Sequence, residues 1–375
     1  MHVYADNAAT TKMHQTAIDT MTYHLNNTFG NPSSLYVIGQ QAKEVLETAR
    51  ADMAACFGAQ PREIYFTSGG SEADNQAITS AAYLGARKGK KHIISTTFEH
   101  HAVLHACEAI SEDGWQIKYM KPSAEGVITP ETLLAHITKG TGLVSVMLAN
   151  NEVGTVQPIK DLAELAHEHH AIVHSDAVQA VGHIPVNVEA LGVDLLSASA
   201  HKFNGPKGIG FLYIRKGTQI SSYENGGAQE GGMRAGTENV AGIVGMATAL
   251  REHFEAMETE AFHLYSLTDA LVQGIQDIPH VLHGENQERL PGLLSLAFPG
   301  YEGEALLHRL DLMGIAVSTG SACDSKRTVI SHVLKSMSVP EEIARSTIRI
   351  SLGAENTIVD VKTISDALHR ILKKR

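Results

Sequence analysis

Short apolar runs alternate with stretches of helical periodicity through much of the chain, and this alternation constrains the fold more than any other feature. The runs have the length of strands and lie at residues 63–67, 92–97, 116–120, 143–149, 171–175, 193–200 and 208–214. Several of them are apolar on both faces, and helical patterns such as residues 130–137 and 158–169 separate them. Buried strands separated by helices are typical of a parallel sheet, so we predict an α/β fold.

The chain has 375 residues, which is more than one simple core usually organises, so we expect two domains or a large domain with a smaller satellite. A long helical pattern begins at residue 240 and is followed by shorter elements. These shorter elements lie around residues 294–298, 315–318 and 347–352 and indicate a smaller α+β domain.

Composition excludes several classes of protein. Thirty Lys and Arg residues face 41 Asp and Glu, and the formal net charge of −11 argues against direct nucleic-acid binding and against binding to anionic membranes. Three cysteines are too few for a disulfide framework, which points to a reducing compartment. The sequence has no signal-peptide pattern and no apolar run of membrane-spanning length, so we expect a cytoplasmic protein.

Polar side chains gather immediately after the predicted strands. They occur at residues 68–71, 99–101, 150–152, 176–179 and 201–202. Ligands of parallel α/β sheets bind at the carboxyl ends of the strands, so these positions are the candidate site.

Lys202 follows the strand at residues 193–200 and precedes a turn containing Gly205 and Pro206. Partial desolvation there would increase the share of neutral amine, which can form a Schiff base with an aldehyde. A surface lysine after a strand is the alternative, and this segment alone leaves both interpretations open.

Two further segments could bind an anion. A Gly-Gly turn at residues 69–70 leads into a helix for which Ser71 is the expected N-cap, and free N–H groups at such a helix start can hold a phosphate. The glycine-rich segment at residues 226–236 could close on an anion. An ordinary capped helix and an ordinary flexible loop remain the alternatives.

Cys323 ends the small-residue stretch at residues 318–323, which suggests an exposed thiol. Cys56 and Cys107 lie inside helical patterns and are interpreted as buried and inert. The histidines at residues 167–170 lack a partner set with metal-ligand spacing, so we predict no metal site.

Ten motifs in one order resemble the cysteine desulfurases of the pyridoxal-phosphate fold type I, class V aminotransferase superfamily. They lie at residues 4–11, 31–34, 67–72, 99–100, 150–154, 174–179, 199–202, 234–237, 320–323 and 349–353. The resemblance implies a mostly parallel seven-stranded sheet in a large domain at residues 14–255. It also implies a small domain, formed by residues 1–13 and 256–375, that carries the cysteine loop.

The resemblance implies pyridoxal 5′-phosphate as the cofactor and assigns residues to each part of it. Lys202 resembles the lysine that forms the Schiff base and takes the proton from the substrate α-carbon. Asp176 would keep the ring nitrogen protonated, and His100 would stack on the ring and act as an acid–base group. The remaining cofactor contacts would come from Asn150 and Gln179 on the ring oxygen side and from Gly70, Ser71, Ser199 and His201 around the phosphate.

The resemblance also assigns substrate and partners. Arg349 would bind the carboxylate of L-cysteine, with Asn31 beside it. Cys323 would take the substrate sulfur as a persulfide, on a segment at residues 324–333 that resembles the flexible-loop type. Thr237 would reach the phosphate of a partner subunit, which implies a homodimer. The persulfide acceptor would be an iron–sulfur scaffold, a tRNA thiolation enzyme or a dedicated apoenzyme.

Four departures from the family pattern affect these expectations. Gly70 and Ser71 replace a common Ala-Thr pair, although the hydroxyl is kept, and Tyr36 stands where a histidine is common. Asp324 follows the cysteine where a small or hydroxyl residue is usual. The sequence ends at Arg375 without the longer tail that some relatives use for scaffold docking, so the choice of acceptor stays open.

Two alternative functions remain at this point. A selenocysteine lyase or another class V enzyme would share the cofactor residues, and Cys323 in its loop favours sulfur transfer. A non-catalytic sulfur carrier or adaptor on the same fold is disfavoured by the intact set of Lys202, Asp176 and His100.

Overall fold

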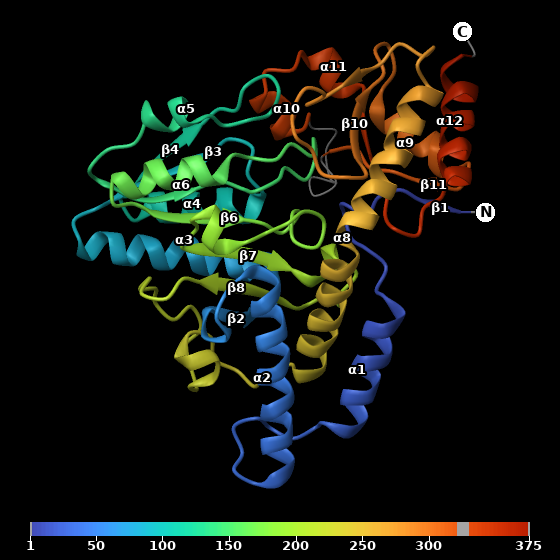
Figure 1. The fold of residues 1–375 in the computed structure, drawn as a ribbon. Coiled ribbons are helices and arrows are strands. Elements are labelled where there is room, and N and C mark those ends of the chain that lie inside the picture. Colours follow the sequence, from blue (N-terminus) through green and yellow to red (C-terminus); the bar gives the residue numbers. More distant parts are fainter. Residues whose placement is uncertain (1, 321–329, 374–375) are drawn as a thin grey trace.

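The computed structural model describes residues 2–320 and 330–373. Its larger part is built on seven strands: β2 (Ile64–Thr67), β3 (His92–Thr96), β4 (Gln116–Met120), β5 (Thr141–Ser145), β6 (Ile172–Asp176), β7 (Leu195–Ser199) and β8 (Gly210–Ile214). They form one sheet in the order β2-β8-β7-β6-β5-β3-β4, in which only β8 runs antiparallel to its neighbours. The predicted α/β fold with a mostly parallel seven-stranded sheet is confirmed (Figure 1).

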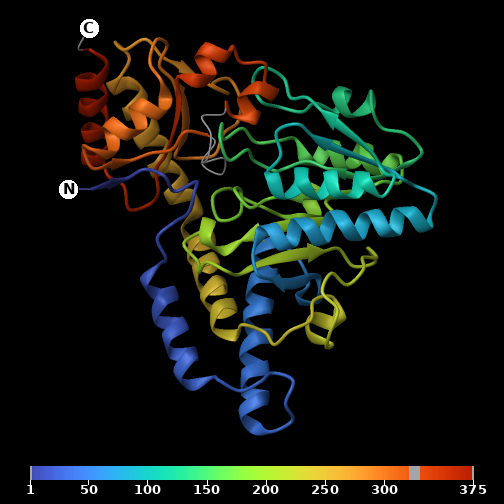
Figure 2. The same ribbon diagram turned by 180° about the vertical axis from the view of Figure 1, so that it is seen from behind.

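Helices cover both faces of this sheet, and every residue of β5, β7 and β8 is buried between them. On the face turned away in Figure 1 and seen in Figure 2 lie α3 (Gly70–Arg87) and α4 (His101–Glu112). The opposite face carries α2 (Val37–Phe57), α6 (Ile159–Glu168) and the first half of α8 (Val240–Gly274). Shorter connecting elements are α1 (Gln15–Asn27), α5 (Pro130–Leu134), α7 (Val188–Leu191) and the 3₁₀ turns η1 (Pro61–Glu63), η2 (Ala200–Lys202) and η3 (Gln229–Gly232).

A second core lies at the other end of α8, where Leu264, Leu267 and Leu271 face the smaller part of the chain. Its strands are β1 (Val3–Tyr4), β9 (Val281–Leu282), β10 (Leu293–Ala297), β11 (Ile315–Ala316) and β12 (Thr347–Ser351), and its helices are α9 (Gly303–Asp311), α10 (His332–Ser336), α11 (Glu341–Arg345) and α12 (Ile358–Leu372). The long helix α8 therefore contributes to both cores (Figure 1). The exact boundaries at residues 13 and 255 stay a prediction.

Most strands lie within two residues of their predicted positions, and two segments differ. The N-terminal residues are too small and polar to suggest a strand, yet β1 pairs in parallel with β11, a partner more than 300 residues away. The run at residues 143–149 leaves the strand at Ser145 and continues as an extended connection beside β6. Pairing with distant parts of the chain determines both the presence of β1 and the end of β5. A local sequence pattern does not predict such pairing.

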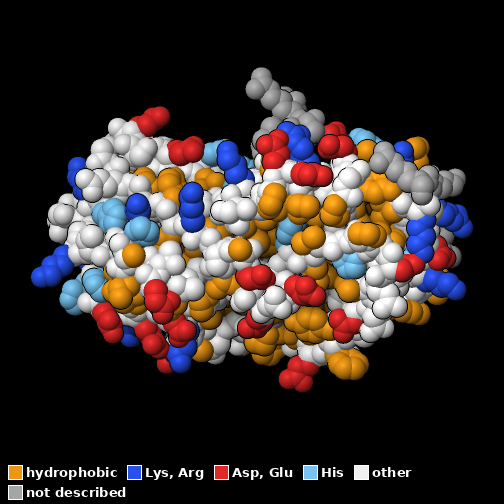
Figure 3. Space-filling view, turned by 90° about the horizontal axis from the view of Figure 1, so that it is seen from above, with side chains coloured by type: hydrophobic (Ala, Val, Ile, Leu, Met, Phe, Trp, Pro, Cys, Tyr) orange, Lys and Arg blue, Asp and Glu red, His pale blue; other side chains and the backbone are white. Residues whose placement is uncertain are grey.

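Charged side chains of both signs lie on the surface of the described residues. Acidic and basic side chains are interspersed over the face seen from above (Figure 3). None of the described helices is long and apolar enough to cross a membrane.

A buried ion pair ties the glycine-rich segment to the edge of the sheet. The Arg50 guanidinium donates two hydrogen bonds of 2.7 Å to Glu230, and the Phe66 N–H donates a third bond of 2.8 Å to the same carboxylate. Glu230 adopts a positive φ of 47°, which costs free energy for a non-glycine residue. The buried guanidinium therefore holds η3 against β2.

We predict that Glu230→Gln destabilises the protein by about 3–5 kcal/mol, because it leaves the Arg50 charge buried without its counter-ion. Urea unfolding should show this loss. The matched control is Glu355→Gln, which removes a pair with Lys12 whose two side chains are each 73% exposed. That change should cost about 0–1 kcal/mol, and similar losses in the two variants would contradict the role of the buried pair.

Candidate active site

A cavity of about 640 Å³ lies where the parallel strands end, between the sheet and the smaller part of the chain. Nine of the predicted site residues line it: Gly70, Ser71, His100, Asp176, Gln179, Ser199, His201, Lys202 and Arg349. Its wall is completed by residues to which the sequence analysis gave no individual role, including residues 8–10, Asp74 and Asn151. Cys323 lies outside the described residues, but Gly320, three positions earlier, lines the same cavity.

The Lys202 ammonium points at the N-terminal segment. Lys202 ends η2, directly after β7, and its Nζ donates hydrogen bonds of 2.6 Å to the Ala8 carbonyl and 2.9 Å to the Ala9 carbonyl. The first family motif therefore holds the lysine side chain at the cavity wall. This placement supports the interpretation of Lys202 as a site residue over that of a surface lysine.

Asp176 is the last residue of β6 and is only 4% exposed. Burial raises the pKa of its carboxyl, whereas the Val178 N–H, which donates to Oδ1 at 2.9 Å, and the positive charge of Lys202 both lower it. These two partners stabilise the carboxylate at the floor of the cavity.

His100 is the N-cap of α4, and its Nδ1 accepts a hydrogen bond of 3.2 Å from the Ala102 N–H. The neutral imidazole therefore carries its hydrogen on Nε2. Burial and, to a smaller extent, the positive charge of Lys202 together lower the pKa of His100 to about 4. At neutral pH the ring is uncharged and can both accept and donate one proton.

The start of α3 lies at one corner of the cavity, and its free N–H groups could bind an anion. Here one prediction is wrong: the N-cap is Gly69, with φ 152°, and Ser71 is the second residue of the helix. The free N–H groups of a helix start remain beside Ser71, Ser199 and His201. His201 is oriented by Thr10, whose hydroxyl lies 3.1 Å from Nδ1, and burial lowers the pKa of His201 to about 4.

Arg349 lies on β12 and is 3% exposed. Its Nη1 donates to the Asn151 carbonyl and its Nη2 to Asp6 Oδ1, both at 2.8 Å, while Nε has no partner among the described residues. These two bonds fix the guanidinium at the cavity wall and leave its Nε–H unused. Such a fixed fork is suited to binding a carboxylate.

Three predicted site residues do not line this cavity. The Asn150 side chain is fully occupied, because it donates to the Phe98 carbonyl and accepts from the N–H groups of Glu152 and Val153. Its neighbour Asn151 lines the cavity instead. Asn31 is exposed in the connection between α1 and α2, and Thr237 lines a separate small cavity with Ser68 and Arg234.

Comparisons with known proteins identify the family of this chain. Residues 3–364 match the family model of class-V aminotransferases. A cysteine desulfurase IscS from Dictyoglomus turgidum is 46% identical over 99% of this chain and 95% of its own length. The solved structure of a NifS-like protein is 39% identical with a TM-score of 0.94 over the whole of both chains, and that of SspA in complex with cysteine is 31% identical with a TM-score of 0.84 over 95% of this chain and 100% of its own.

The chain belongs to the class-V aminotransferase family. Within that family it is an enzyme of the cysteine desulfurase group, to which the IscS and NifS-like proteins belong.

The cavity fits pyridoxal phosphate, the cofactor of this family. Its polar wall contains two buried atoms without a hydrogen-bond partner among the described residues: Gln179 Oε1 and Arg349 Nε. Buried polar atoms are normally paired, so unpaired ones around a cavity indicate that a polar ligand completes the site. A helix start at one end and a carboxylate at the floor match the phosphate and the ring nitrogen.

One departure from the family pattern has a structural counterpart. A Cβ atom on Gly70 would lie 2.6 Å from Val178 Cγ2, which is well inside van der Waals contact. The branched side chain of Val178, two residues beyond Asp176, thus occupies space that a larger residue at position 70 would need.

We predict that Gly70→Ala lowers stability by about 1–3 kcal/mol through this overlap. Val178→Ala in the same chain should restore most of the loss, because it removes the methyl group that collides. Thermal unfolding of the two single variants and the double variant measures the coupling. Additive losses in the double variant would contradict direct contact between the two side chains.

Proposed function

We propose that this cysteine desulfurase binds pyridoxal 5′-phosphate in the cavity and converts L-cysteine to L-alanine, leaving a persulfide on Cys323. The observation that carries the proposal is the convergence of Lys202, Asp176 and Arg349 on one cavity. An amine, a carboxylate and a guanidinium in this arrangement meet the needs of an aldehyde cofactor, its ring nitrogen and an amino-acid carboxylate.

The bound cofactor would supply an aldehyde that condenses with amines and a protonated ring that delocalises electrons from the substrate α-carbon. Lys202 would provide the amine and then act as the base that takes the α-proton. Asp176 would keep the ring nitrogen protonated by holding a negative charge beside it. The helix start at Ser71, together with Ser199 and His201, would hold the phosphate.

Substrate binding would use the fixed guanidinium of Arg349, whose unpaired Nε faces no other described acceptor. The neutral His100 would exchange a proton with the substrate thiol. The Cys323 thiolate would then attack the substrate sulfur and form an S–S bond. The substrate C–S bond breaks, its electron pair stays on the departing carbon chain, and a proton there completes L-alanine.

Cys323 is the thiol best suited to this step. Burial raises the pKa of Cys56 to about 11 and that of Cys107 to about 12, so both remain protonated at neutral pH. Since only the thiolate is a good nucleophile, these two cysteines are poor candidates. Gly320 brings the start of the cysteine segment to the cavity wall.

We extend the proposal to a cytoplasmic homodimer that passes its sulfur to an acceptor protein. The connection between α1 and α2 and the first residue of α2 expose large apolar side chains: Phe29 at 74%, Leu35 at 93%, Tyr36 at 62% and Val37 at 72%. An apolar surface of this kind is typical of a protein interface. Thr237 lies away from this chain's cavity, as expected for a residue that serves a partner subunit.

The cofactor assignment predicts that wild-type protein loaded with pyridoxal phosphate has an absorption band at a longer wavelength than the ultraviolet absorbance of the protein itself. Lys202→Ala should abolish the lysine-linked band and lower desulfurase activity by about 10²–10⁴-fold, the usual contribution of a general base. Lys216→Ala is the control, since it changes an exposed lysine after β8. A wild-type protein that develops no band would refute the cofactor assignment.

The assignment of the nucleophile predicts that Cys323→Ser retains cofactor binding and cysteine binding but loses sulfide release. After L-cysteine is added, mass spectrometry of wild-type protein should find one extra sulfur on the peptide that contains Cys323. Cys56→Ser is the matched control and should behave like wild type. Sulfide release by Cys323→Ser at the wild-type rate would remove Cys323 from the reaction.

A further inference from the structure

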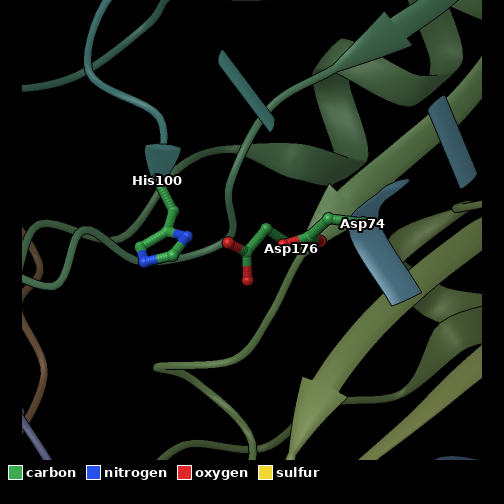
Figure 4. A group of neighbouring side chains, drawn as sticks. All are labelled: Asp74, His100 and Asp176. Atoms are coloured by element: carbon green, nitrogen blue, oxygen red, sulfur yellow. The ribbon is translucent and has the colours of Figure 1, made fainter. Parts of the chain in front are cut away.

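Behind Asp176 lies a second buried carboxyl, Asp74, to which the family resemblance assigned no role. It lies on α3, is 1% exposed, and has one oxygen, Oδ1, without a hydrogen-bond partner among the described residues. One carboxyl oxygen each of Asp74 and Asp176 and one ring nitrogen of His100 all lie within 4.8 Å of one another. Figure 4 shows the two carboxyls side by side, with His100 on the far side of Asp176.

Asp74 is the end of a chain of buried polar groups inside the sheet. The Ser197 hydroxyl hydrogen bonds to its carboxyl, and His174 Nε2 lies 3.6 Å from Oδ1. His174 in turn contacts Ser197 Oγ and Ser145 Oγ, each at 2.9 Å. Burial lowers the pKa of His174 to about 3, so the imidazole is neutral and provides no positive charge for Asp74.

If both of these neighbouring buried carboxyls were ionised at neutral pH, the repulsion between their charges would cost a large free energy. Their surroundings decide which one carries the charge. Asp176 receives the Val178 N–H and the field of Lys202. Asp74 has only the Ser197 hydrogen bond, while burial and the neighbouring carboxyls of Asp176 and Glu99 raise its pKa.

The geometry points to Asp74 as a positioning residue that keeps its proton behind Asp176, so that the pair carries one negative charge and that charge is on the carboxyl facing the cofactor ring. A neutral acid at this place fills the space behind Asp176 without competing for the ring proton. Burial away from water can keep a carboxylic acid neutral at pH 7. Here the neutral acid would be Asp74, which lies behind the aspartate that faces the proposed cofactor.

Few other ionisable groups could change this balance. The strands β5 and β8 and the nearest part of β7 present serines and apolar side chains to α3, with Leu195, Leu212 and Ile214 packed against it. In the described part of the chain, the elements packed against α3 carry these ionisable side chains: Tyr65 on β2, His101, His105, Cys107, Glu108 and Glu112 on α4, His174 and Asp176 on β6, and Tyr213 on β8. Glu99, His100 and Lys202 lie beside these elements. Burial raises the pKa of Glu99 to about 8, so it is also protonated at neutral pH.

The raised pKa of Asp74 fixes the sign of its effect on stability. An acid whose pKa is higher in the folded than in the unfolded protein stabilises the fold at low pH, and this contribution is lost as pH rises through the folded value. The unfolding midpoint of wild-type protein should therefore fall relative to that of Asp74→Asn as pH rises, because asparagine copies the neutral acid and cannot ionise.

The proposal rests on the cofactor site proposed above, and infrared spectroscopy tests it without the cofactor. Wild-type protein with ¹³C-labelled aspartate carboxyls should show, at neutral pH, a protonated-carboxyl stretching band that disappears in Asp74→Asn. Asp194→Asn is the matched control, because Asp194 immediately precedes β7 and pairs with His167 at 2.9 Å, and this variant should keep the band. The label separates Asp74 from the protonated Glu99.

Cofactor affinity provides the second readout. At neutral pH, Asp74→Asn should keep the dissociation constant of pyridoxal phosphate within about twofold of wild type, whereas Asp176→Asn, which removes the charge, should raise it about tenfold or more. A labelled band that persists in Asp74→Asn, or equal losses of affinity in both variants, would overturn the proposal. Failure of wild-type protein to bind the cofactor would instead refute the proposed function. The infrared measurement does not depend on the cofactor, so it would still show whether Asp74 is protonated.

Discussion

The shared edge at which the parallel strands end is the constraint on which the rest of this enzyme depends. Strands β3, β5, β6 and β7 run in one direction, so the residues that follow them meet at one edge of the sheet. The hydrogen bonding between neighbouring strands ends there, so polar side chains can contact a ligand without interrupting the core. Asp176 and Lys202 are close for this reason, although 26 positions separate them, and the start of α3 adds unpaired N–H groups at the same edge.

The cavity is completed by distant parts of the chain. The carbonyls of Ala8 and Ala9 hold the Lys202 ammonium, and Arg349 comes from a strand of the second core. Helix α8 packs into both cores, so the two walls of the cavity are joined by a continuous rigid element (Figure 1). This arrangement keeps the lysine and the arginine in fixed positions, which catalysis by positioning requires.

The charge of each side chain in the site depends on its burial as much as on its residue type. His100 and His201 are neutral because desolvation lowers their pKa values, and the nearby lysine acts in the same direction. Asp176 keeps its charge only through the Val178 N–H and Lys202, and the protonated state proposed for Asp74 follows from the absence of such partners. Neutral buried acids and bases of this kind cost less than unpaired charges and leave one charge where the cofactor needs it.

The sequence by itself determined the α/β fold, the polar strand ends and, through ten ordered motifs, the family. Apolar periodicity and turn chemistry are local, so they survive in the one-dimensional pattern. Only the tertiary structure decided that Asn151 and not Asn150 lines the cavity, that Gly69 caps α3, and that Asp74 lies behind Asp176. Adjacent residues on an irregular segment face different ways, and a helix residue such as Asp74 meets a strand residue 102 positions away only when the sheet has formed. Contacts between residues so far apart in the sequence produce no periodic pattern in it, because only the packing of the folded chain brings those residues together.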